Sequence, residues 1–397
     1  MTSLTGDGIP FEKPEFERRI SLVKQEMERR GIDTLLISEP SNVYYLTGYE
    51  GWSFYVFQML VVHRDLDEPI WVGRMMDVTS ARRMTYLSED SLQPYTDDYV
   101  QSAEREPVDF LVMRLKELCP TLNAIGVEMG AYYYSAHTHA RLVAALPQAQ
   151  FVNAELLINW IRIRKSAAEI AIMREAGKIS DAIIGDAVAA ARPGMRECDL
   201  AAVVYQRMIA GTPEHGGVYT TSPPFLCVGE RSAEPHAPWS DRTIGNDIPV
   251  NLETSGCRRR YHSPISRTIF LGTPSDSYRH LADAVVEGIE TALAEVRPGV
   301  TCADVERAWQ TTIARHGLHK EARLGYAIGI GFPPTWGERT ASLRSSDMTV
   351  LEPGMAFHMM PGLWLGDVGV TITQSFVVTE TGREDLTSYP RELVVKP

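Results

Sequence analysis

The side chains best suited to acid–base chemistry in this sequence are His236 and Glu253. His236 stands in the Pro-rich stretch AEPHAPW, and Glu253 ends the apolar run DIPVNLE. An imidazole titrates near neutral pH, and a carboxylate at the inner end of a buried strand is costly unless it is paired or functional. Together they could move a proton and attack a carbon. By residue type alone, a surface-loop histidine is the simpler interpretation of His236, and a salt bridge to the arginines at 258–260 is the alternative for Glu253.

Polar residues just downstream could bind a substrate. Tyr261 and His262 lie in RYHSP, where His262 could hydrogen-bond a substrate or a reaction intermediate. A satisfied core histidine is the equal alternative, because buried polar groups in proteins are normally hydrogen-bonded. Arg267 on the next strand could bind a substrate carboxylate, with a structural ion pair as its alternative.

Aromatic side chains could hold a cationic group. In WGER, Trp336 could cover a cation with its π face and Glu338 could balance its charge, beside Arg339. Ordinary core packing is the alternative for each aromatic. The other substrate-binding candidates of this kind are His358, Trp364, Trp52 and Phe54.

Length and charge limit the class of protein. The chain has 397 residues, which predicts two domains. Its 39 basic and 51 acidic residues give a net charge of -12, which argues against nucleic acid as a partner. We find no apolar run of about 18 residues and no secretory signal. Five scattered cysteines without a CxxC pair predict reduced thiols in a cytoplasmic protein.

Strands that alternate with helices predict an N-terminal α/β domain over residues 1–160. Its first helix carries Phe16, Ile20, Val23 and Met27 at helical spacing. We expect helices near 14–30, 106–118 and 136–146, and strands near 34–40, 57–63, 69–73, 124–129 and 150–153.

The second domain, residues 161–397, is predicted to be α+β. Ser166 and Glu169 form a capping-box pattern before a long amphipathic helix that ends at Pro193-Gly194. The order helix-helix-strands then occurs twice, which indicates a duplicated half. We expect further helices near 197–211, 275–296 and 302–316, and strands near 247–253, 265–271, 321–330, 355–361 and 369–378.

The stretches NVYYLTGY, IRIRKSAAEIAIMREAG, YHSPISRTIFLG and LEPGMAFHMMPGLW resemble the creatinase, prolidase and aminopeptidase P family. The resemblance covers almost the whole chain. It implies a pita-bread fold for the C-terminal domain, with two duplicated α+β halves around a central site, and a smaller N-terminal α/β domain. It also implies a homodimer in which the N-domain segment containing Trp52 and Phe54 reaches the neighbouring site.

The metallopeptidases of this family hold two metal ions with two Asp, one His and two Glu, a donor set that suits divalent cations. Placed on this sequence, the motifs retain a single carboxylate. The five positions fall on or next to Glu253, Pro264, Ile328, Met360 and Thr373. Pro, Ile and Met offer no oxygen or nitrogen ligand, and one carboxylate alone cannot hold a dinuclear site, so we predict an enzyme without a metal or other cofactor.

Creatinase departs from the peptidases in the same way, and its acid–base His corresponds to His236. However, it has substrate-binding carboxylates where this chain has Ser266 and a residue near Thr373, which makes creatine a poor candidate. The chain resembles the ectoine hydrolases of this family more closely, in YEGWSFYVFQ, GVEMGAYYYSA, WGERTASLR and PGLWLGDVGVTIT. Thr371 and Gln374 replace acidic residues of that group, so a related solute is an open alternative.

We therefore predict a metal-free hydrolase that cleaves a C–N bond of a small cyclic amidine, with ectoine giving N-acetyl-diaminobutyrate as the first choice. The predicted partner is a small zwitterionic or cationic substrate, with His236 as general acid and base, and Glu253 as nucleophile or base. The alternatives are a creatinase-like amidinohydrolase, a metal-dependent Xaa-Pro peptidase and a non-catalytic binding protein.

Overall fold

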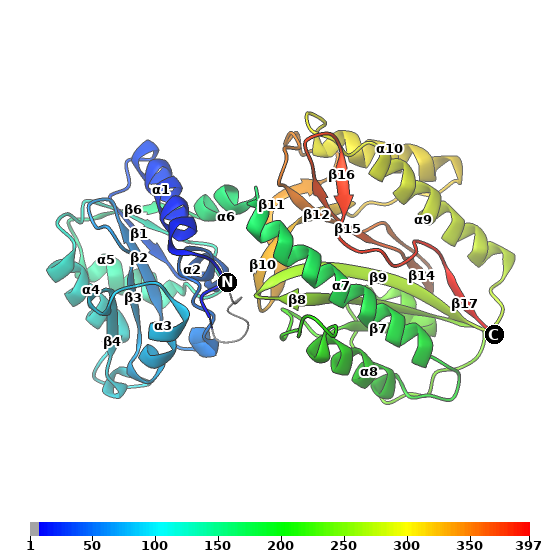
Figure 1. The fold of residues 1–397 in the computed structure, drawn as a ribbon, viewed down its shortest axis with the longest axis horizontal. Helices are drawn as coiled ribbons and strands as arrows, with labels where there is room; N and C mark the ends of the chain where they lie inside the picture. Colours follow the sequence, from blue (N-terminus) through cyan, green and yellow to red (C-terminus); the bar gives the residue numbers. More distant parts are fainter. Residues whose placement is uncertain (1–7) are drawn as a thin grey trace. The chain divides into compact units, whose positions relative to one another are not determined.

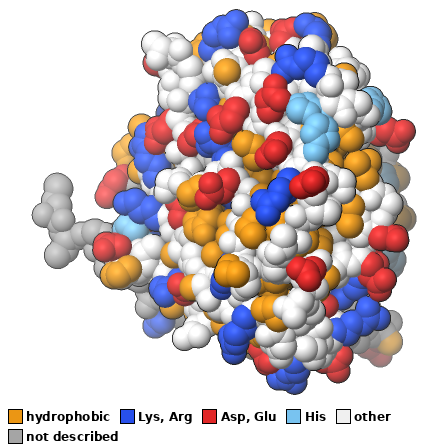
Figure 2. Space-filling view, turned by 90° about the vertical axis from the view of Figure 1, so that its right-hand side faces the viewer, with side chains coloured by type: hydrophobic (Ala, Val, Ile, Leu, Met, Phe, Trp, Pro, Cys, Tyr) orange, Lys and Arg blue, Asp and Glu red, His pale blue; other side chains and the backbone are white. Residues whose placement is uncertain are grey.

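A computed structural model describes residues 8–397. The chain divides into two compact units, Met1–Arg162 and Ile163–Pro397, and each is described by itself. Within the described residues, no helix is long and apolar enough to cross a membrane. Figure 2 shows one face of the molecule, on which acidic and basic side chains alternate around apolar ones, so the net negative charge is not gathered there into a single patch.

The first unit contains a six-stranded sheet in the order β4-β3-β2-β1-β5-β6, flanked by helices (Figure 1). In α1 the residues predicted to face the core, from Phe16 to Met27, are buried. The strands are β1 Thr34–Ile37, β2 Met59–His63, β3 Ile70–Arg74, β4 Leu92–Tyr95, β5 Ala124–Val127 and β6 Gln150–Asn153. The helices are α1 Lys13–Arg29, α2 Pro40–Thr47, α3 Val78–Met84, α4 Pro107–Leu118, α5 Ala136–Ala145 and α6 Leu157–Arg162.

Strand β4 is the strand of this sheet that the sequence pattern did not predict. Its sequence LQPY contains Pro94, which lacks a backbone N–H and is rare inside sheets. The structure places β4 at the edge of the sheet, parallel to β3, where one side of the strand needs no partner. The missing donor is therefore tolerated.

The second unit contains a mainly antiparallel sheet in the order β16-β15-β12-β10-β9-β8-β7, with β11 beside β10 and β17 parallel to β9. The order helix-helix-strands occurs in both halves, as the pita-bread prediction requires (Figure 1). The helices are α7 Ala167–Ala190, α8 Glu197–Ala210, α9 Asp276–Ala294 and α10 Cys302–Arg315. The strands are β7 Phe225–Val228, β8 Ile248–Arg258, β9 Tyr261–Leu271, β10 Gly325–Phe332, β11 Thr335–Leu343, β12 Ala356–Met359, β13 Gly362–Leu365, β14 Val368–Thr371, β15 Gln374–Val378, β16 Arg383–Asp385 and β17 Val394–Lys396.

Helix α7 begins at the predicted capping box. The Ser166 side chain accepts a hydrogen bond from the backbone N–H of Glu169, and the Glu169 carboxylate accepts one from Ser166 N. The helix then packs directly on β8 because Gly256 has no side chain: a Cβ there would lie 2.1 Å from the carbonyl oxygen of Ala176. Ser180 strengthens this contact by accepting from Gly256 N at 2.7 Å.

The hairpin β8–β9 is longer than predicted. Both strands were expected to stop short, yet they continue to a two-residue turn at Arg259 and Arg260, with φ values of 45° and 63°. Such turns are usually marked by Asn-Gly, and Arg259-Arg260 carries no such signal. Arg260 is held in place through hydrogen bonds from its guanidinium to the carbonyl oxygens of Gly331 and Tyr219.

Other differences from the predicted elements lie around the site. The stretch expected as one strand at 369–378 forms β14 and β15, which belong to two different sheets and separate at residues 372–373. Strands β7, β11 and β13 were not predicted, because their sequences lack a clear alternation of apolar and polar residues.

Candidate active site

A small cavity of about 10 Å³ lies in the second unit beside the hairpin β8–β9. Strands β7, β8 and β9 and the hairpin β13–β14 contribute its walls, together with the segment that follows Ser232. Its walls carry both polar and aromatic side chains. They include Phe225, Glu253, Ser266, Trp364 and Thr371.

Glu253 is the carboxylate that reaches this cavity from β8. It lies opposite Phe225 on β7 and Ser266 on β9 in the antiparallel ladder. Burial raises the pKa of Glu253 to about 7, and the positive charge of Lys320 opposes this rise. A carboxyl group with a pKa near neutrality can exist in both forms at physiological pH, which suits proton transfer and nucleophilic attack.

His236 is exposed in the loop that closes one side of the cavity. Its ring packs edge-on against Phe225, with 5.3 Å between ring centroids, and its neighbour Pro235 lines the cavity. Phe225 thus contacts His236 and is also the cross-strand partner of Glu253. The two predicted catalytic residues are therefore brought to the same part of the fold, with Glu253 at the wall and His236 at the rim.

Two buried groups hold this loop against the sheet. The thiol of Cys227 donates to the carbonyl oxygen of Glu234 at 2.9 Å. The buried carboxylate of Glu197 accepts from the backbone N–H of Ser240 at 2.6 Å and from Arg231 at 3.1 Å. The Pro-rich loop is therefore anchored on both sides of His236.

A chain of hydrogen bonds runs through the sheet and includes Thr373, which falls on or next to one of the five predicted metal-ligand positions. Trp336 Nε1 donates to the Tyr326 hydroxyl at 2.9 Å, and the same hydroxyl lies 3.2 Å from His358 Nδ1. His358 Nε2 lies 2.8 Å from Thr373 Oγ1, which also accepts from Ser266 N. Burial, with help from Arg267 and Arg323, lowers the pKa of His358 to about 3, so its ring is neutral at physiological pH.

The positions predicted to correspond to the family's metal ligands are occupied by other side chains in the fold. Pro264 and Ile328 are buried in strands β9 and β10, and Thr373 is engaged in the hydrogen-bond chain. Within residues 8–397, no three side chains of His, Cys, Asp or Glu lie close enough to share a metal ion. This donor set does not fit the dinuclear centre of the family's peptidases.

Arg267 and Tyr261 do not face the cavity. All three guanidinium nitrogens of Arg267 donate to backbone carbonyl oxygens, among them Thr373 O at 2.6 Å and Pro390 O at 2.6 Å. The prediction that Arg267 binds a substrate carboxylate therefore needs correction, because its donors fix the C-terminal segment on β9. The Tyr261 hydroxyl donates to Glu169 at 2.8 Å, which ties β9 to the first turn of α7.

Glu338 also already has a partner within the fold. It forms an ion pair with Lys165 at 2.6 Å, and both side chains are 1% exposed. Glu338 therefore does not fit its predicted role of balancing a substrate cation. Its neighbour Arg339 is half-buried with a left-handed φ of 59°. His262 is fully buried: its Nδ1 lies 3.0 Å from Arg260 O, whereas its Nε2 has no hydrogen-bond partner among the described residues, so only one side of the ring is satisfied in the core.

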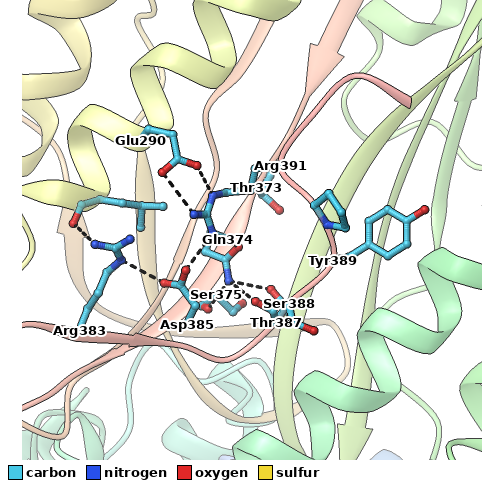
Figure 3. Close-up of polar contacts among 12 residues, drawn as sticks. Glu290, Thr373, Gln374, Ser375, Arg383, Asp385, Thr387, Ser388, Tyr389 and Arg391 are labelled. Carbon is cyan, nitrogen blue, oxygen red and sulfur yellow. Dashed lines mark hydrogen bonds and ion pairs between the residues drawn. The ribbon is translucent and has the colours of Figure 1, made fainter. Parts of the chain in front are cut away.

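Thr371 and Gln374, the two residues at which this chain differs from the ectoine hydrolases, lie in different surroundings. Thr371 lines the cavity, and its hydroxyl accepts from Ser266 Oγ at 2.7 Å. Gln374 is fully buried elsewhere: its amide nitrogen lies 2.8 Å from Thr387 O, and its oxygen accepts from Arg391 (Figure 3). Gln374 therefore serves the packing of the C-terminal segment, and Thr371 is the departure that can affect a substrate.

The remaining aromatic candidates lie in three different parts of the structure. Trp364 lines the cavity from β13, as predicted for a site residue, whereas Trp336 and His358 belong to the hydrogen-bond chain. In the first unit, Trp52 is 53% exposed, while Phe54 is buried between Trp52 and Tyr133. Only Trp52 of this pair therefore offers its side chain to solvent.

Sequence reasoning missed Lys320, which follows α10 and contacts Trp364. It also missed Tyr326 and Ser266 as members of the site's polar network. Lysine is usually a surface residue, and nothing around Lys320 in the sequence signals burial. The one usable signal was its place just before the predicted strand at 321–330.

This fold and site define a pita-bread hydrolase related to the creatinases and prolidases. The Creatinase/Prolidase N-terminal domain matches residues 19–164, and Metallopeptidase family M24 matches residues 171–380. The chain belongs to this family and is a hydrolase. The solved structures similar to it include a prolidase from Thermococcus sibiricus, with a TM-score of 0.84 and 20% identity over 96% of this chain and 99% of that one.

Two curated relatives are similar to the chain over nearly all of both sequences. An uncharacterized hydrolase/peptidase of Sinorhizobium fredii is 52% identical over 98% of this chain and 99% of its own length. The ectoine hydrolase of Halomonas elongata is 42% identical, again over 98% and 99%. The predicted resemblance to the creatinase family, and to ectoine hydrolase within it, is confirmed.

Proposed function

We propose that this protein hydrolyses a C–N bond of a small cyclic amidine, with ectoine as the first substrate and N-acetyl-diaminobutyrate as the product. The observation that carries this proposal is Glu253, a carboxylate with its pKa raised to about 7 in the wall of a cavity that also contains Trp364. The 42% identity to an ectoine hydrolase over the whole chain supports the choice of ectoine.

The cavity offers the groups that opening an amidine ring requires. A cationic ring is attracted by the Glu253 carboxylate and by the π face of Trp364. The ring nitrogen must gain a proton as its bond to the amidine carbon breaks, and His236 at the rim is the group assigned to that step. Water supplies the oxygen that remains on the carbon as the amide carbonyl.

Glu253 has two chemically complete roles. As a base, it takes a proton from the attacking water. As a nucleophile, its carboxylate attacks the amidine carbon, and water then cleaves the resulting ester-like bond and regenerates the carboxylate. One turnover in water labelled with heavy oxygen tests the second route: label enters the Glu253 side chain only if Glu253 is the nucleophile and water attacks its carboxyl carbon, in which case the product keeps an oxygen from Glu253.

We propose further that this reaction needs no bound metal. The support is the donor set: one carboxylate remains, and the other positions carry Pro264, Ile328, Met360 and Thr373. The hydroxyl of Thr373 is already bonded to Ser266 N and His358. Side chains must therefore supply the proton transfers that metal-bound water supplies in the peptidases.

Creatine is a weaker candidate on the same geometry. A guanidinium group is best held by paired carboxylates, yet Ser266 and Thr371 form the polar wall opposite Glu253 and bond to one another. Hydroxyectoine keeps the amidine ring and adds a hydroxyl, so it is the natural second substrate to compare.

The test is to treat the pure protein with a chelator and incubate it with ectoine, hydroxyectoine and creatine, following ring opening or urea release by NMR. We expect ectoine to be opened at an unchanged rate after chelation. Turnover that disappears with the chelator and returns with manganese would contradict metal independence, and no turnover of either ring would contradict the proposed substrate class.

The matched variants are His236→Ala and His137→Ala. His137 is also an exposed histidine, but it lies in the first unit on α5. We expect His236→Ala to lose activity by about 100-fold or more, the usual scale for a general acid–base group, while its circular dichroism stays unchanged. A fully active His236→Ala protein would remove His236 from the mechanism.

A further inference from the structure

Lys320 is a buried ammonium group that the proposed mechanism does not use. Its side chain is 5% exposed, and its backbone carbonyl accepts a hydrogen bond from Gln310 on α10 at 2.6 Å. Its Nζ donates to Gly362 O at 2.8 Å and lies 4.4 Å from the centroid of the Trp364 ring. Both contacts are to β13, the strand that brings Trp364 into the wall of the cavity.

This ammonium has no direct anionic partner. Among residues 8–397, no carboxylate lies within ion-pair distance of Lys320. One backbone carbonyl uses one of its three N–H donors, and the Trp364 face offers a weak electrostatic contact. A buried charge without an anionic partner is costly, and a bound anion would remove much of that cost.

The other charge of this region is Glu253. Burial lowers the pKa of Lys320 to about 8, and Glu253 is the charge that opposes this fall. The carboxylate and the ammonium therefore act on one another without touching. Trp364 joins them, since it contacts Lys320 and lines the cavity together with Glu253.

We propose that Lys320 binds the carboxylate of the substrate, so that the site selects a zwitterion whose cationic ring lies against Glu253. The inference rests on the proposed amidine hydrolysis and adds a specificity-determining residue to it. The cavity of about 10 Å³ has room for about one water molecule, so its walls must shift before a ring can enter. Trp364 lines the cavity and lies against the Lys320 ammonium, so a shift of this wall residue would bring the ammonium within reach of the ligand.

A competing role for Lys320 is to hold Glu253 in its ionised form. The groups that face this pair are Tyr326 on β10, Cys227 on β7 and Glu234 in the loop, and Arg323 lies beside Tyr326. Under this alternative, loss of Lys320 affects every substrate equally. Two substrates that differ only in the carboxylate therefore separate the two roles, because both depend on the same Glu253.

The experiment compares ectoine with the same methyl-tetrahydropyrimidine ring lacking the carboxylate, using wild type, Lys320→Met and Lys320→Arg. We expect Lys320→Met to lower kcat/KM for ectoine by roughly 10- to 150-fold, the range for a hydrogen bond to a charged group, and to change the value for the decarboxylated ring by less than about threefold. Lys320→Arg keeps the charge and should retain most of the preference for ectoine.

Lys178→Met is the matched control, because Lys178 is exposed on α7. It should leave both substrates unchanged. Equal loss of activity on both rings in Lys320→Met, at any pH, would overturn the carboxylate-binding role. A Lys320→Met protein that does not fold leaves the decision to Lys320→Arg, whose loss of the preference for ectoine would equally overturn it.

A readout without turnover keeps this inference separate from the proposed function. The melting temperature is measured in sodium acetate and in sodium chloride at equal ionic strength. We expect a saturable rise with acetate in wild type that is absent in Lys320→Met. If wild type opens no amidine ring, the proposed function fails and this measurement decides on Lys320 alone. No acetate effect in wild type would then overturn the role.

Discussion

Glu253 experiences two opposing influences on its proton. Burial favours the neutral acid and raises the pKa to about 7, while the Lys320 ammonium favours the carboxylate. Both proposed roles of Glu253, base and nucleophile, require the ionised form. The acid limb of the pH profile of kcat/KM should therefore rise through about pH 7, and activity should fall as the pH drops below it.

Glu253→Gln removes the group that would act on the substrate as base or nucleophile. We expect its activity to fall by at least about a thousandfold, as for other groups that act directly on the reacting atoms. We also expect a gain of stability at higher pH. The folded pKa of Glu253, about 7, lies above its usual value of 4.5, so its contribution to stability is present below pH 4.5 and is lost as the pH rises through 7.

Glu253→Gln has no carboxyl group to ionise at this position, so it does not lose stability in this way as the pH rises. Its melting temperature should exceed that of wild type by an amount that grows between pH 4.5 and 7 and then stays level, corresponding to about 1–3 kcal/mol. The control is Glu230→Gln, because Glu230 is exposed. A Glu253→Gln protein whose difference from wild type does not change with pH would show that Glu253 is not held near neutrality.

The neutral ring of His358 makes it unsuitable as the proton donor of the reaction. Its pKa of about 3 means that it carries no charge at physiological pH, and both of its nitrogens already have partners in Tyr326 and Thr373. It therefore positions the polar network and does not compete with His236 as the proton donor. Exposure distinguishes the two histidines, since His236 reaches solvent and His358 does not.

At the scale of elements, the close approach of α7 to β8 positions Glu253. Gly256 lies on the same strand, three residues beyond it, and a methyl group there would overlap the backbone of α7 at Ala176. We expect Gly256→Ala to lower the free energy of unfolding by about 1–3 kcal/mol, the usual cost of overpacking. Urea denaturation followed by fluorescence measures this.

Gly185 on α7 gives the matched comparison. No atom outside the helix lies within 4 Å of a Cβ built there, and alanine is the better helix former. Gly185→Ala should therefore raise the free energy of unfolding, by up to about 1 kcal/mol. If Gly256→Ala proves as stable as wild type, the helix is not fixed on the hairpin by this contact.

Long regular elements were predictable from the sequence, and short ones around the site were not. The helices α7 to α10 have strong apolar periodicity, and two of them begin at capping boxes. Strands β7 and β13 are four residues each and are stabilised by neighbours distant in sequence. Local patterns carry little information about such pairing, because the partners decide it.

At the scale of the whole molecule, we propose a homodimer in which the first unit contributes to the neighbouring site. Trp52 is the candidate residue, since it is 53% exposed, whereas Phe54 is packed within its own unit. A symmetric dimer makes a specific prediction, because each site then combines Glu253 of one chain with Trp52 of the other.

The measurement is complementation. Trp52→Ala and Glu253→Gln are each expected to be nearly inactive. After the two are mixed and allowed to exchange subunits, half of the dimers should be mixed and each should contain one intact site, which restores about a quarter of wild-type activity. Glu253→Gln mixed with itself is the control. A mixture that stays inactive although exchange has occurred would exclude the shared site.

The sequence by itself determined the family, the order of the elements and the identity of the carboxylate at Glu253. It also determined that Pro264, Ile328 and Met360 offer no side-chain oxygen or nitrogen to a metal ion, because residue type alone limits which atoms are available. These conclusions depend on local patterns and on the chemistry of single side chains.

Only the tertiary structure decided which candidates reach the cavity. Glu338 was assigned to a substrate cation, yet its partner is Lys165, 173 positions away. Arg267 similarly donates hydrogen bonds to carbonyl oxygens of residues more than 100 positions later in the sequence. Lys320 lies next to the site because its backbone carbonyl is bonded to Gln310 on α10 and its Nζ is bonded to Gly362 on β13. Hydrogen-bond donors and charges are assigned by proximity in the fold, and sequence spacing does not specify that proximity.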